Sequence, residues 1–234
     1  MNQIISQHGW GFDSSLWTEL KNLFIKNNCI WQDNERGYFN KDFFAPEWIK
    51  NNSHTQRKIT IVHSLGTHLI DRSILLNASH AIFINSFYNF IPNHNDRKLI
   101  TKSLERMQKK LNNKEIKTML NEFYKNSFFP NQIDMNFKRI REIKFENINI
   151  LRLKSDFQKL YTISKPPILV SKDCSILIIK SMNDRILSHN SSFSFTELMN
   201  KTQIKKPRII EIEDQGHIIS NYKIFKLIDN WIQQ

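Results

Sequence analysis

The segment Lys58-Ile-Thr-Ile-Val-His-Ser-Leu-Gly-Thr67 decides the fold. Its first part is an apolar, β-branched run of strand length that leads directly into Ser64. A helix-like apolar pattern follows at Leu69, Ile70 and Ile74. A serine between a strand and a helix is the context of a nucleophile elbow, a tight turn that exposes the hydroxyl. The same turn places the N–H of Leu65 at a helix N-terminus, ready to stabilise an oxyanion.

The motif around this serine departs from the usual pattern G-x-S-x-G. Val62 occupies the first glycine position, and Gly66 keeps the second. The first glycine avoids a clash at the tight turn, so we expect a local adjustment around Val62. Gly66 lets the helix start close against the strand. Because an S-x-G triplet alone is common by chance, the assignment of Ser64 as a nucleophile needs support from the rest of the chain.

Strand-like runs recur through the chain and alternate with helical patterns. The apolar, β-branched runs are Gln3–Ser6, Cys29–Trp31, Ile59–Val62, Ala81–Ile84, Ser175–Lys180 and Arg208–Ile212. Helical spacings of three and four residues occur over Leu16–Phe24 and Ile224–Trp231. This alternation predicts an α/β fold, with a mostly parallel sheet of about six strands and helices on both faces.

The stretch from about residue 89 to residue 148 breaks the alternation, because it contains three helical patterns in a row. They lie over Ile100–Leu111, Ile116–Phe123 and Ile133–Ile143. Helices inserted between strands predict a lid over one end of the sheet. We therefore expect residues 1–88 and 149–234 to form an α/β core and residues 89–148 to form a helical lid.

An acid and a histidine follow the last two predicted strands. Asp184 follows the fifth run and His217 follows the sixth. The chain order Ser, Asp, His, with each group at the carboxyl end of a parallel strand, predicts an α/β-hydrolase fold in which Ser64, Asp184 and His217 form a catalytic triad. Alternatively, Asp184 only caps the segment that follows it. Asp214 is a rival acid, but three residues from His217 it would more easily serve its own loop.

A second oxyanion donor is expected after the first predicted strand. The segment His8-Gly-Trp-Gly11 is a glycine-flanked turn at that strand's carboxyl end. In α/β-hydrolases such a turn supplies a backbone N–H to the oxyanion, here that of Trp10 beside that of Leu65. The simpler interpretation is a turn that only ends the strand.

Composition limits the class of protein. Of the 234 residues 40% are apolar, which suits one domain with a real core. No stretch approaches the roughly 20 apolar residues of a membrane span, and the N-terminal segment lacks the pattern of a signal peptide. Cys29 and Cys174 are predicted to be free, buried thiols of a reducing compartment. We expect a cytoplasmic monomer with no metal, no cofactor and no membrane partner.

Positive charge is concentrated in the predicted lid. The net charge is +12, and between residues 89 and 150 thirteen lysines and arginines oppose seven acids. A basic lid over the serine would steer an acidic partner to the site, although exposed helices also carry solvated lysines for no such purpose. The tightest basic cluster, and the first candidate for partner contact, is Lys138, Arg139 and Arg141.

Four segments resemble the pimeloyl-acyl-carrier-protein methyl ester esterases of biotin synthesis. HGWGFDSSLW, IVHSLG, SMNDRI and DQGHIIS occur in that family's order and approximate spacing. The HGWG segment with Trp17 a few residues later is the most family-specific part. The resemblance covers most of the chain but is weak in the lid. Matched in this way, the chain begins at what would be the family's third strand.

The resemblance implies hydrolysis of a methyl ester on a pimeloyl chain carried by an acyl carrier protein. By position it implies Ser64, Asp184 and His217 as the triad and Trp10 and Leu65 as the oxyanion donors. Acyl carrier proteins are strongly acidic, which agrees with a basic lid.

Three alternatives remain open at this point. The first is a general carboxylesterase, thioesterase or lactonase on the same scaffold. The second is a basic nucleic-acid-binding protein, although the sequence has no helix-turn-helix, RNP or zinc-finger signature, and we expect no nucleic-acid partner. The third is a catalytically dead hydrolase fold, which the replacement of glycine by Val62 keeps open.

Overall fold

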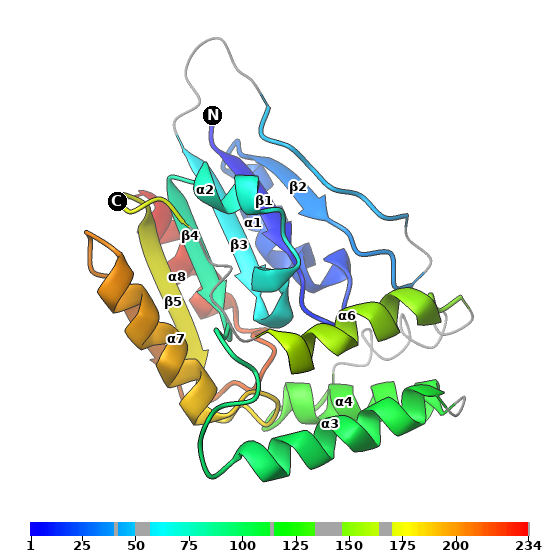
Figure 1. Cartoon of the computed structure of the whole chain (residues 1–234). Coiled ribbons are helices and arrows are strands. Elements are labelled where there is room, and N and C mark those ends of the chain that lie inside the picture. The colour runs from blue at the N-terminus through cyan, green and yellow to red at the C-terminus, as the bar shows by residue number, and fades with distance from the viewer. Residues whose placement is uncertain (40–41, 50–56, 113–114, 134–146, 164–169, 234) are drawn as a thin grey trace.

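The computed structural model describes residues 1–39, 42–49, 57–112, 115–133, 147–163 and 170–233 (Figure 1). Its centre is a six-stranded sheet in the order β2-β1-β3-β4-β5-β6, and all neighbouring strands are parallel. The strands are β1 (Gln3–Gln7), β2 (Ile30–Asn34), β3 (Lys58–His63), β4 (His80–Ile84), β5 (Ser175–Ser181) and β6 (Arg208–Ile212). Each of the six predicted strands forms, so the expected sheet is confirmed.

Helices cover both faces of this sheet. Helices α1 (Thr18–Lys26) and α8 (Tyr222–Gln233) lie on one face, and α2 (Arg72–Leu76) and α7 (His189–Thr202) lie on the other. Successive side chains of a strand point to opposite faces, so the neighbours Ile61 and Val62 enter different apolar clusters. Ile61 packs in the cluster that includes α1 and α8, and Val62 in the cluster that includes α2 and α7.

A third group of helices lies across the carboxyl ends of the strands (Figure 1). It consists of α3 (Arg97–Asn112), α4 (Ile116–Phe128) and α6 (Ile150–Thr162), whose apolar faces form one buried cluster with Trp10 and Leu65. The sequence predicted α3 and α4. It did not predict α6 or α7, and α6 lies beyond residue 148, where we ended the predicted lid. The third predicted lid helix falls almost entirely in residues 134–146, outside the described residues.

Within the described part of the chain, no helix is both long and apolar enough to cross a membrane. Cys29 and Cys174 are both buried and are not joined in a disulfide, as predicted.

Candidate active site

Ser64 follows β3 directly and begins a short 3-10 helix, Ser64–His68. Its φ is +53°, in the left-handed region that residues other than glycine rarely adopt. A serine in this strained conformation, at the end of a central parallel strand, has the geometry of a nucleophile elbow. The helix-like pattern predicted after the serine is therefore a 3-10 turn followed by α2.

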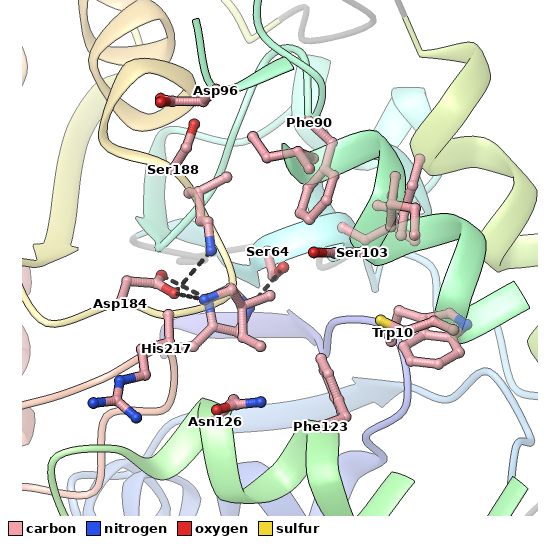
Figure 2. Close-up of a pocket in the computed structure, with 18 of the residues that line it drawn as sticks. Trp10, Ser64, Phe90, Asp96, Ser103, Phe123, Asn126, Asp184, Ser188 and His217 are labelled. Carbon is pink, nitrogen blue, oxygen red and sulfur yellow. Dashed lines mark hydrogen bonds and ion pairs between the residues drawn. The ribbon is translucent and has the colours of Figure 1, made fainter. Parts of the chain in front are cut away.

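The structure brings Ser64, His217 and Asp184 into one chain of hydrogen bonds (Figure 2). Nε2 of His217 lies 2.9 Å from Oγ of Ser64, and Nδ1 of His217 lies 2.7 Å from Oδ2 of Asp184. His217 follows β6 and is 1% exposed, while Asp184 follows β5. Because Oδ2 can only accept, it keeps a proton on Nδ1 and leaves Nε2 free to receive the serine proton.

The carboxylate of Asp184 is itself held in a fixed rotation. Its Oδ1 accepts hydrogen bonds from the backbone N–H groups of Ile186 and Leu187, at 2.7 and 2.9 Å. Asp184 therefore caps the following segment, which was its alternative role, and binds His217 at the same time. The rival Asp214 accepts a hydrogen bond from Asn221 of its own loop, at 3.3 Å. The geometry thus favours Asp184 as the partner of His217.

Two residues that the sequence analysis missed hold His217 through its backbone carbonyl. That oxygen accepts hydrogen bonds from Nδ2 of Asn85 at 2.8 Å and from Nε2 of His63 at 2.9 Å. Burial, together with the neighbouring His217, holds the pKa of the His63 imidazole well below its usual range. His63 is therefore a neutral donor at physiological pH.

Asn85 joins three strand ends. It follows β4, and its Oδ1 accepts from the N–H of Ser181 at 2.8 Å, while its Nδ2 also lies 3.0 Å from Oγ of Ser181 and 3.2 Å from the carbonyl oxygen of Gly216. Its φ of +44° is one that asparagine tolerates better than most residues. The signal for Asn85 was its position, directly after a predicted strand at the same sheet edge as Asp184 and His217.

The departure from the usual elbow motif is accommodated locally. The side chain of Val62 is fully buried and belongs to the same apolar cluster as Ile70 and Ile74. Gly66 is required sterically, because a Cβ there would lie 2.7 Å from the carbonyl oxygen of Gln7. The turn after Ser64 therefore packs directly on the end of β1.

The HGWG turn lies beside the serine, as its predicted role requires. A Cβ added to Gly9 would lie 3.0 Å from Cβ of Ser64 and 2.9 Å from Nδ1 of His63. Trp10 and Leu65 both line the same cavity as Ser64. Their roles as oxyanion donors stay predictions.

Ser64 and His217 open into a cavity of about 340 Å³ beneath the third group of helices (Figure 2). Most of its lining is apolar and comes from α3, α4, α6 and the loop after β5. The apolar lining residues from these helices are Leu99, Ile100, Leu104, Met107, Phe123 and Leu160. Outside the triad, the polar or charged residues of the lining are Asp96, Ser103, Asn126, Arg185 and Ser188. Such a lining suits an apolar or weakly polar substrate.

The outer side of α3 is strongly basic. Its exposed cationic residues are Arg97, Lys98, Lys102, Arg106 and Lys109. The predicted contact residues Lys138, Arg139 and Arg141 lie outside the described residues. In the described ranges, no group of three or more histidine, cysteine or acidic side chains is arranged to hold a metal ion.

The parallel sheet, the tight turn at Ser64 and the loops that follow the strands are arranged as in the α/β-hydrolase fold. Comparisons with known proteins agree with this fold. No protein-family model and no curated protein sequence matches the chain. Among solved structures, the chain is similar to a bromoperoxidase from Bacillus anthracis, with a TM-score of 0.73, 12% identity and coverage of 100% of this chain and 92% of that one.

Two further solved structures each cover 100% of this chain with 92% of their own. An esterase from Exiguobacterium antarcticum has a TM-score of 0.68 and 14% identity, and an enol-lactonase from Burkholderia xenovorans LB400 has a TM-score of 0.66 and 10% identity. At such identities the likeness shows the fold. The chain has the α/β-hydrolase fold, as the sequence predicted.

Proposed function

We propose that this protein is a serine hydrolase of carboxylic esters, with Ser64 as nucleophile, His217 as general base and Asp184 as the acid that orients the histidine. The observation that carries the proposal is the unbroken chain of hydrogen bonds from Oγ of Ser64 to Asp184, at 2.9 and 2.7 Å. It opens into a largely apolar cavity that can hold an acyl group.

In the first half-reaction, Oγ of Ser64 attacks the ester carbonyl carbon while its proton passes to Nε2 of His217. The resulting oxyanion is bound by the N–H groups of Trp10 and Leu65. The bond to the alcohol oxygen then breaks, and the alcohol leaves with the proton from His217. In the second half-reaction, water gives a proton to His217 and attacks the acyl carbon; Ser64 then takes the proton back and the carboxylic acid is released.

The finer proposal is that the substrate is the methyl ester of a pimeloyl chain on an acyl carrier protein. The sequence resemblance supports it, and so does the two-sided character of α3. Ile100, Leu104 and Met107 of this helix line the cavity, whereas Arg97, Lys98 and Lys102 are exposed on its outer side. An acidic carrier bound to that basic side would hold its acyl chain close to the cavity mouth.

Hydrolysis of pimeloyl-carrier-protein methyl ester by the purified protein tests the proposal, with Ser64→Ala as the inactive comparison. Release of methanol by the wild type alone would support both nucleophile and substrate. Covalent labelling of Ser64 by a fluorophosphonate without hydrolysis of this ester would keep the triad and remove the biotin assignment. No labelling and no hydrolysis of any ester would contradict the proposed function and favour the catalytically dead fold.

The carrier's role is tested separately by charge reversal. The double variant Lys98→Glu, Lys102→Glu should raise KM for the carrier-bound ester and leave hydrolysis of p-nitrophenyl acetate unchanged. Lys201→Glu, at an exposed lysine of α7, is the matched control and should change neither. Equal turnover of free and carrier-bound methyl esters would instead favour a general carboxylesterase, and salt-sensitive DNA binding without esterase activity would favour the nucleic-acid alternative.

A further inference from the structure

Two buried side chains outside the triad, His8 and Glu35, hydrogen-bond to the backbone of the turn that follows β1 and to each other. His8 is fully buried and Glu35 is 4% exposed. Nδ1 of His8 lies 2.9 Å from the carbonyl oxygen of Gly9. Since a carbonyl oxygen can only accept, Nδ1 carries a proton and donates it. The imidazole of His8 thus fixes the direction of the Gly9 carbonyl.

The other side of the His8 ring is also anchored. Nε2 lies 3.2 Å from Oε1 of Glu35 and 3.2 Å from the backbone nitrogen of Arg36. If Nε2 is unprotonated it accepts from Arg36, and if it carries a proton it donates to Glu35. In either state the ring has a partner at both nitrogens, which keeps it from rotating.

Glu35 is in turn a fixed anion. Its Oε2 accepts from the N–H of Ser14 at 2.9 Å, and its Oε1 accepts from the N–H of Gly37 at 3.2 Å. Burial alone would raise its pKa, but the hydrogen bond and positive charge of a protonated His8, together with the hydrogen bond from Ser14, outweigh burial and lower the pKa of the Glu35 carboxyl to about 2. The carboxylate therefore stays charged at every pH at which the enzyme would work.

The hydrogen bond to Gly9 matters because of the planarity of the next peptide. In a trans peptide the carbonyl of Gly9 and the N–H of Trp10 point in opposite directions. Gly9 cannot carry a side chain, since a Cβ would collide with His63 and Ser64. A glycine also rotates more freely than other residues, so the orientation of the Gly9–Trp10 peptide depends on its hydrogen bonds. Besides His8, only a long bond from the N–H of Phe12, at 3.4 Å, is seen on the Gly9 carbonyl within the described residues.

We infer that His8 and Glu35 are positioning residues of the oxyanion hole, which hold the Gly9–Trp10 peptide with its carbonyl toward the imidazole and the Trp10 N–H toward the opposite side. A flipped peptide would present a carbonyl oxygen where the oxyanion needs a donor. This inference rests on the proposed function and adds to it that the second donor is set by a pair of side chains 27 residues apart in sequence.

A pair of substitutions at His8 separates the hydrogen bond from the volume of the ring. His8→Leu fills the space but has no donor, whereas the amide nitrogen of His8→Asn can take the place of Nδ1. The readouts are kcat and KM for p-nitrophenyl acetate and the inhibition constant of a boronic acid, whose adduct with Ser64 is a tetrahedral anion. His80→Leu, at the opposite edge of the sheet, is the control for loss of a histidine.

Loss of an oxyanion donor costs about 10²–10³-fold in kcat, so a donor that is only misplaced should cost about 10–100-fold. We expect His8→Leu to lose that factor in kcat and in boronic acid affinity with little change in KM, and His8→Asn to recover most of it. A folded His8→Leu protein with unchanged kcat and boronic acid affinity would overturn the inference. His80→Leu should match the wild type in both readouts.

Glu35→Gln provides the second test if His8→Leu does not fold. It keeps the shape of the side chain and removes the charge that holds the ring, so a smaller loss of about 3–10-fold in the same two readouts is expected. Unchanged values would contradict the inference. A wild-type protein that neither cleaves esters nor binds the boronic acid would instead contradict the proposed function, and the two failures are therefore distinguishable.

Discussion

Removal of the Asn85 side chain is the sharpest test of how the site is assembled. Its amide makes four hydrogen bonds, at 2.8 to 3.2 Å, to the end of β5 and to the loop that carries His217. Asn85→Ala removes all four and leaves the N–H of Ser181 without that acceptor. Asn85→Gly removes the same bonds but, unlike alanine, adopts the φ of +44° at no steric cost.

The expected cost in stability follows from these contacts. A buried hydrogen bond contributes about 0.5–1.5 kcal/mol net, and the three acceptors of Nδ2 share two hydrogens, so the amide accounts for about 2–4 kcal/mol. A left-handed alanine adds about 1 kcal/mol. Against a typical stability of about 5–15 kcal/mol, both variants of Asn85 should remain folded, with the glycine variant the more stable.

The expected cost in activity is separate. His63 still binds the carbonyl oxygen of His217, so the imidazole should shift rather than detach. Displacement of a reacting group by about 1 Å can cost about 10²-fold, and we expect kcat for p-nitrophenyl acetate to fall by about 10–100-fold in both variants, with KM nearly unchanged.

Steady-state kinetics and urea unfolding on the same preparations measure both effects. Asn77→Ala, at an exposed asparagine that also donates to a backbone carbonyl, is the control and should keep full activity. A folded Asn85→Gly protein with kcat within about twofold of the wild type would refute the claim that Asn85 positions the histidine.

Three further predictions concern single side chains. Burial holds the pKa of His68 at about 4. Below about pH 6.5 the unfolded chain therefore binds a proton at this residue that the native protein does not bind. The free energy of unfolding should fall by up to about 1.4 kcal/mol per pH unit as the pH drops from 6.5 toward 4. His68→Gln, which can still donate to Phe87, should reduce this slope in urea unfolding between pH 7 and pH 5, and an identical slope would contradict the assignment. Val62→Gly restores the usual motif but empties a buried site, and it should lower stability by about 2–4 kcal/mol in thermal unfolding; a gain would show that the valine is strained. In Asp184→Asn the backbone N–H groups of Ile186 and Leu187 should hydrogen-bond to the amide oxygen, so the NH₂ group faces Nδ1 of His217. Nδ1 must then accept, which places the imidazole proton on Nε2, and kcat should fall by about 10⁴-fold. A fall of less than about tenfold would argue against Asp184 as the acid that orients His217.

Local sequence was sufficient for the strands and for the candidate triad. Each strand contains a short apolar run rich in β-branched residues, and such a run is visible without knowledge of any distant residue. Parallel strands end at one edge of the sheet, so residues directly after them, such as Asp184 and His217, could be placed near Ser64 from order alone.

The helices were harder to predict. Helix α7 carries serines and asparagines among its apolar residues, which obscure its helical pattern. Helix α6 has Leu153, Phe157 and Leu160 at helical spacing, but it lies beyond the predicted end of the lid and this signal was missed. Packing against the sheet and against α3 stabilises these segments, and such tertiary contacts outweigh intrinsic preference.

What the sequence by itself determined is the α/β-hydrolase fold and the identity of the three residues that meet in the candidate site. Only the tertiary structure decided which groups hold them: Asn85 and His63 on the carbonyl of His217, and His8 with Glu35 behind the Gly9–Trp10 turn. The physical reason is that side-chain periodicity and chain order are local properties. A buried polar group, in contrast, takes whichever partner the folded chain brings within hydrogen-bonding distance, and that partner can lie more than a hundred residues away.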